Sequence, residues 1–100
     1  MSVFSKLKQF KDMRDQGKKL QAALKDETAS ATAAGGQVSI VLDGNLKINR
    51  LEIAPEMMSP DKKERLQSAV KEAHNEALER MQKIISGKVR ETGVTLPGMN

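Results

Sequence analysis

The sequence predicts an α+β fold in which two helices flank a central β-hairpin. Apolar residues recur at helical spacing over residues 3–25 and again over the long segment 59–92. Between these segments, the stretch VSIVLDGNLKINRLEI (residues 38–53) alternates apolar and polar residues as β-strands do. Because a hairpin alone is only marginally stable in water, we expect the helices, a second copy of the chain, or both, to cover it.

The composition indicates one domain, expected to span residues 1–100. Phe4 and Phe10 are the only aromatic residues, so the core is thin, and chains of this size often gain burial by oligomerising. The absence of cysteine excludes disulfides and thiolate metal sites. No apolar run approaches the ~18 residues of a membrane span or forms a signal peptide, which favours a cytoplasmic location.

The charge is concentrated at one end of the chain. Residues 1–25, the basic arm, hold seven basic and two acidic side chains, whereas the other 75 residues hold ten basic and eleven acidic ones. The net charge of +4 therefore comes from the arm. Such an asymmetry suggests a polyanionic partner.

The arm predicts a helix over residues 3–25 with a narrow apolar stripe. Spacings of three and four separate the stripe residues, which are Phe10, Met13, Gly17, Leu20 and Leu24. A repeat near 3.5 residues is typical of a helix packed along another helix. Gly17 on this stripe either lets two backbones approach closely or weakens the helix.

The same helix carries a row of cations, the candidate DNA-binding residues. Lys11, Arg14, Lys18 and Lys25 line up roughly a quarter turn from the stripe, while Lys8 and Lys19 lie further round. Cations spaced along a rod suit the phosphate backbone of DNA. A membrane surface, an acidic protein or a merely solubilising face are the alternatives. Because the sequence has no base-reading motif, DNA contacts would be chiefly electrostatic.

Residues 26–36, DETASATAAGG, allow two interpretations. Alternation of Thr28, Ser30 and Thr32 with alanine favours a weak edge strand, and the small polar composition favours a flexible linker. Further on, Asp43-Gly44 predicts the hairpin turn, because both residues tolerate positive φ.

The returning strand has a parity conflict. Leu46 and Ile48 share one parity, while Leu51 and Ile53 share the other, so a regular strand cannot place all four on one face. Either a bulge falls near Asn49-Arg50 or both faces are partly buried. The residues expected to pack in the core or a dimer interface are Phe10, Met13, Leu20, Leu24, Val38, Ile40, Leu42, Ile48, Leu51 and Ile53.

The second helix has clear boundary signals. Ala54-Pro55 ends the sheet segment 26–54, and Ser59 then provides an N-cap with Pro60 at the first helical position. The helix is expected to stop at Gly93, before a flexible tail over 93–100. Its buried face is predicted at Leu66, Val70, Ala73, Ala77, Met81 and Ile84.

Nothing in the sequence predicts catalysis. His74, the only histidine, has no ligand partner at a recognised spacing, and Glu72 and Glu76 lie among cations on a solvated helix face. Gly35-Gly36 lacks the Lys-Ser/Thr of a phosphate-binding loop. We expect no enzyme activity, metal, cofactor or small-molecule substrate.

Several segments together resemble the YbaB/EbfC family of bacterial nucleoid-associated proteins. They are GGQVSIVLDGN, LKINRLEIAPEMM, the helix SPDKKERLQSAVKEAHNEALERMQK and the ending TGVTLPGM. Each motif is weak alone, but their order and the length of the chain are fairly specific. One departure is Ala54 before Pro55, where the family usually has an acid.

The resemblance implies three antiparallel strands, with residues 27–33 as the first, between the two helices. It also implies an intertwined homodimer with projecting helical arms, binding duplex DNA with little sequence preference in nucleoid organisation or gene regulation. The alternative is a dimeric adaptor that docks an acidic protein partner, for example in DNA repair or recombination. The family motif transfers no catalytic residue, and no membrane partner is expected.

Overall fold

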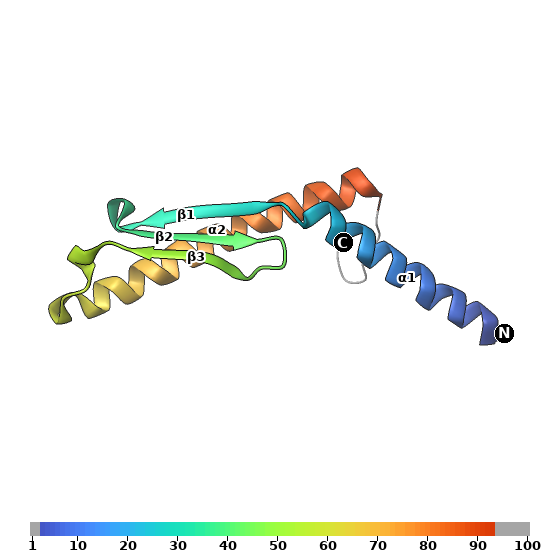
Figure 1. Ribbon diagram of the computed structural model, residues 1–100, viewed down its shortest axis with the longest axis horizontal. Coiled ribbons are helices and arrows are strands. Elements are labelled where there is room, and N and C mark those ends of the chain that lie inside the picture. Colours follow the sequence, from blue (N-terminus) through green and yellow to red (C-terminus); the bar gives the residue numbers. More distant parts are fainter. Residues whose placement is uncertain (1–2, 94–100) are drawn as a thin grey trace.

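The computed structural model describes residues 3–93, and it describes side chains from Leu7 onward. Of the tail predicted at 93–100, all residues after Gly93 lie outside the described residues. The elements are α1 (Val3–Leu24), β1 (Thr28–Ala33), β2 (Val38–Asp43), β3 (Ile48–Ile53) and α2 (Lys63–Thr92). The strands form an antiparallel sheet in the order β1-β2-β3, and α2 runs along one face of it (Figure 1). The predicted α+β fold is confirmed.

The first strand exists, which resolves the two interpretations of residues 26–36. Along β1 the alanines are buried and the hydroxyl residues are exposed, in strict alternation. Ala31 and Ala33 pack in one cluster with Ala73 and Ala77 of α2. Small side chains on both sides let the helix lie close to the sheet, and this tertiary packing supports a strand of weak intrinsic propensity.

A bulge resolves the parity conflict in β3. Val41 pairs with Arg50, but Leu42 pairs with Ile48, so Asn49 is an extra residue. Of the two alternatives that the sequence left open, the structure has the bulge near Asn49-Arg50. The shift turns the apolar residues on both sides of Asn49 toward the same face of the sheet.

The β2–β3 turn lies at the predicted place, but its geometry differs from the prediction. Asp43 C=O accepts a hydrogen bond from Leu46 N–H at 3.0 Å, and Leu46 has a φ of 66°. The left-handed residue is therefore Leu46 rather than Gly44, as in a three-residue hairpin loop. Glycine is needed at position 44 for another reason, because a Cβ there would overlap the Leu24 backbone and lie 2.8 Å from Leu24 Cβ.

The start of α2 also differs from the prediction. Ser59 precedes a short 3-10 helix at Pro60–Lys62, and α2 begins only at Lys63 with Lys62 as its N-cap residue. Pro60 still occupies the first helical position, but in a 3-10 turn, which is tighter than an α-helical one. At the other end α2 stops before Gly93, which has a φ of 69°.

The buried face of α2 is narrower than predicted. It consists of Ala69, Ala73, Ala77 and Met81. Leu66, Val70 and Ile84 are only half-buried. Leu66 and Val70 pack against the edge of the larger apolar cluster, and Ile84 packs against Leu20 and Leu24 of α1.

The molecule has two apolar clusters and an elongated shape. The larger cluster joins α2 to β1 and β2, with Val38, Ile40 and Leu42 buried at its centre. The smaller cluster joins Leu20 and Leu24 of α1 to the C-terminal part of α2. The rest of α1 projects past this contact (Figure 1), and the molecule measures 65 × 23 × 21 Å.

Candidate nucleic-acid interface

Among the described side chains of the basic arm, those that pack against the body lie at its C-terminal end. Leu20 and Leu24 pack against Ile84, Ile85 and Val89 of α2. Nearer the N-terminus the apolar stripe continues on an uncovered helix. Phe10 is 71% exposed and Met13 is 51% exposed, so their assignment to dimer packing stays a prediction.

The predicted DNA-binding side chains are all exposed. Lys8, Lys11, Arg14, Lys18 and Lys19 lie on α1, whereas Lys25 lies one residue beyond its end. The helical alignment of Lys25 with the row is therefore wrong, because the chain has left the helix there. Within the described side chains, no ion pair includes any of these six residues.

The described cations of α1, from Lys8 onward, divide into two rows of different net charge. Lys11, Arg14 and Lys18 form one row, which spans about 10 Å at ~1.5 Å per residue. Lys8 and Lys19 lie on another side of the helix, where Asp12 and Asp15 fall between them. The first row therefore carries most of the uncompensated positive charge.

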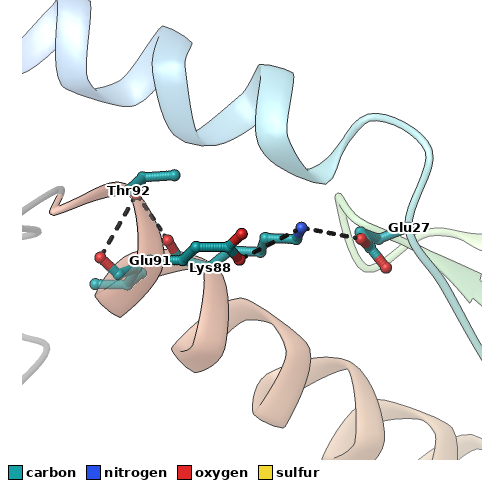
Figure 2. Close-up of polar contacts among 5 residues, drawn as sticks. Glu27, Lys88, Glu91 and Thr92 are labelled. Atoms are coloured by element: carbon teal, nitrogen blue, oxygen red, sulfur yellow. Dashed lines mark hydrogen bonds and ion pairs between the residues drawn. The ribbon is translucent and has the colours of Figure 1, made fainter.

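Polar contacts tie the base of the arm to α2. Lys88 Nζ lies 3.4 Å from a carboxylate oxygen of Glu27 and 3.6 Å from one of Glu91 (Figure 2). The hydrogen bond with Glu27, together with the charge of Glu91, raises the pKa of Lys88. Because Glu27 follows α1 closely in sequence, this contact lies beside the point where the arm leaves the sheet.

The hairpin tip contacts the same junction. Gly44 is buried and its α-carbon lies against the backbone of Leu24, the last residue of α1. The arm is therefore held by an apolar cluster, an ion pair and a backbone contact. These contacts position the cations without touching them.

A second uncovered surface lies along β3. Leu51 pairs with Ile40 and Ile53 with Val38, so these side chains point toward the α2 side of the sheet. Ile48 is nevertheless 52% exposed and Leu51 44% exposed, while Ile53 is half-buried. Ile53 lines a hollow with Leu66 and Val70 of α2. Ile48 and Leu51 lie on the same face of β3 as Ile53, and we call these five residues together the β3 shelf.

Sequence reasoning missed the long-range contacts of three residues that organise this arrangement. They are Gly44, Lys88 and Arg80, whose guanidinium bonds the Ser30 carbonyl of β1. Each acts on a residue distant in sequence, so no local pattern identifies it. Among the described residues, no cluster of potential ligands suits a metal ion, and no helix is long and apolar enough to span a bilayer.

Comparison with known proteins agrees with this arrangement. Residues 1–94 match the profile of the YbaB/EbfC DNA-binding family. A nucleoid-associated protein of Pelotomaculum thermopropionicum is 38% identical over 95 residues, covering 93% of this chain and 90% of the relative. One from Exiguobacterium sibiricum is 39% identical over 83 residues, covering 81% and 78%.

A solved structure shares the fold. The crystal structure of an uncharacterized protein from Helicobacter pylori superposes with a TM-score of 0.70 at 18% identity. The match covers 92% of this chain and 97% of that one.

Proposed function

Because the chain belongs to the YbaB/EbfC DNA-binding family, we propose that it binds duplex DNA through the phosphate backbone with little sequence specificity. The observation that carries the proposal is the row of Lys11, Arg14 and Lys18 on a helix that projects from the body. A projecting rod reaches phosphates without steric interference from the sheet. Flexible lysines are suited to point-charge contacts, which position a protein on DNA but do not read bases.

The functional unit in this proposal is a homodimer. The β3 shelf and the stripe residues Phe10 and Met13 leave large apolar side chains in water. A second copy that covers them would complete a core that is thin in the single chain. Two-fold pairing doubles the basic arm, so two rows of cations face one duplex.

The cellular role follows from this chemistry. Backbone contacts without base reading suit a protein that coats, bends or bridges many sites, so we place it at the nucleoid, in the cytoplasm. There it contributes to DNA organisation or gene regulation. Nucleoid-associated is also the description of its bacterial relatives.

A double charge reversal tests the arm. Lys11→Glu with Lys18→Glu should weaken binding to unrelated duplexes equally. The slope of log K against log salt should become less negative by about 4 units, because each dimer loses four phosphate contacts. The matched control is Lys63→Glu with Lys83→Glu, two exposed lysines of α2. Fluorescence anisotropy measures both variants beside the wild type.

The outcomes separate the two candidate functions. Equal DNA affinity of the arm variant and the wild type would contradict the arm as the DNA-binding site. If the wild type itself does not bind DNA, the result favours the second candidate function, an adaptor that docks an acidic protein. The groove beside Leu7, Phe10, Lys11 and Arg14 then offers an apolar and cationic surface for an acidic amphipathic segment.

A further inference from the structure

The two edges of the sheet differ in whether a side chain hydrogen-bonds to their outward-facing backbone groups. Asp43 N–H donates to Lys47 C=O, and Gln37 C=O accepts from Ala54 N–H, so the odd-numbered residues of β2 bond toward β3. The even-numbered residues of β2 therefore bond toward the alanines of β1. It follows that the hydroxyl residues Thr28, Ser30 and Thr32 direct their N–H and C=O groups outward, away from the sheet.

An arginine from α2 closes this outer edge. Arg80 Nη1 donates to Ser30 C=O at 2.6 Å, and Nη2 lies 2.6 Å from Glu76 Oε1. Ser30 is the middle one of the three outward-facing residues, so the guanidinium sits where a neighbouring strand would have to lie. Glu76 precedes Arg80 by one helical turn and holds the fork in position.

The anchor of Arg80 is rigid, and a second charged contact lies close by. Ala77 and Met81, on either side of Arg80 along α2, are buried in the core. At the Thr28 end of the same edge, Glu27 pairs with Lys88. Charged side chains at a strand edge oppose pairing with another chain.

Within the part of the chain that the structure describes, the outer edge of β3 carries no such cap. Because Arg50 and Glu52 pair with odd-numbered residues of β2, the backbone groups of Leu51 and Ile53 face outward. Among the hydrogen bonds of the described residues outside the sheet ladders, none ends on these groups. The open edge also borders the β3 shelf, whereas the closed edge does not.

We propose that Arg80 is an edge cap that confines strand pairing between copies of this chain to β3. Pairing of β3 with β3 is two-fold and closes after two copies. Pairing of β1 with β3 is head-to-tail and leaves an open edge for the next copy, so it leads to growing assemblies. The cap thus excludes a second copy from the edge that would not close.

The test removes the guanidinium and keeps its aliphatic stem. We expect Arg80→Met to form concentration-dependent species with at least about twice the wild-type mean mass in sedimentation velocity. Lys83→Met, which removes one exposed charge from the same helix, should keep the wild-type size. Far-UV circular dichroism and thermal melting report whether each variant is folded.

A proline substitution identifies the edge responsible. Ser30→Pro removes an outward N–H that is not part of the ladder, so an edge strand tolerates it. Combined with Arg80→Met, it should return the size distribution to that of the wild type. Should Arg80→Met fail to fold, Glu76→Gln keeps the arginine but removes its anchor, and weaker growth with the same reversal is expected.

Two results would overturn the proposal. One is a wild-type size distribution for folded Arg80→Met or, where that variant fails to fold, for Glu76→Gln. The other is growth that Ser30→Pro does not reverse. Both comparisons use the wild-type size as reference, whatever that size is, and neither contains DNA. Failure of the cap is therefore distinguishable from failure of the proposed dimer or of DNA binding.

Discussion

At the scale of single residues, two glycines differ in whether the fold requires the absence of a Cβ. Gly44 is buried against Leu24, and an added Cβ would meet backbone that cannot move without shifting the arm. Gly17 lies inside α1, and an added Cβ would meet nothing within 4 Å in the single chain. The first glycine is required by packing, whereas the second only costs helix stability.

Alanine substitutions at these glycines should therefore have opposite signs. Gly44→Ala should lower the free energy of unfolding by about 1–3 kcal/mol, as for overpacking. Gly17→Ala should raise it by up to about 1 kcal/mol through helix propensity. Urea unfolding measures both. Destabilisation by Gly17→Ala would instead indicate that another backbone packs closely on this position in the assembled protein.

At the scale of elements, residue patterns predicted those parts that depend on local sequence. The two helices and the hairpin follow from periodicity, whereas parity left the bulge near Asn49 as one of two alternatives. The existence of β1 was undecided by its residues, because its alanines become favourable only against the alanines of α2. The contact between Arg80 and Ser30 joins positions fifty residues apart, so no spacing rule predicts it.

The ion pair at the base of the arm gives a pH-dependent prediction. The hydrogen bond with Glu27 raises the pKa of Lys88 above 10.5. The stability that this ion pair contributes is therefore present below pH 10.5 and is lost as pH rises through the raised pKa. Wild type should be more stable than Glu27→Gln near neutral pH, and the difference should shrink in alkaline solution. Thermal melting at several pH values measures it.

The control is Glu79→Gln, which changes an exposed carboxylate of α2 that forms no ion pair among the described side chains. Its stability difference from the wild type should not vary in the same way above pH 10.5. A constant difference for Glu27→Gln across the alkaline range would contradict a stabilising pair at this junction.

At the scale of the whole molecule, the single chain is incomplete as a globule. Its arm projects, its β3 edge is open and its β3 shelf is exposed on the side facing α2. A thin core leaves little stability in reserve, so covering the exposed apolar surface with a second copy would add to the stability of the chain. The proposed dimer brings these three features into one explanation.

A charge placed on the β3 shelf should separate the dimer. Leu51→Lys puts an ammonium group among apolar residues that the proposed interface buries, so we expect at least a tenfold weaker dimer, equivalent to about 1.4 kcal/mol. Thr32→Lys, on the exposed side of β1, is the matched control. Sedimentation equilibrium measures both, and an unchanged dimer constant for Leu51→Lys would exclude the shelf from the interface.

The salt dependence of DNA binding reports directly on phosphate contacts by the arms. Fluorescence anisotropy on two unrelated duplexes of about 30 base pairs should give similar affinities and a slope of log K against log salt of about −5, for six phosphate contacts from two rows of three cations. Such a result is expected if cations on projecting helices bind the DNA backbone. A flat salt dependence, or strong preference for one duplex, would contradict backbone binding by the arms.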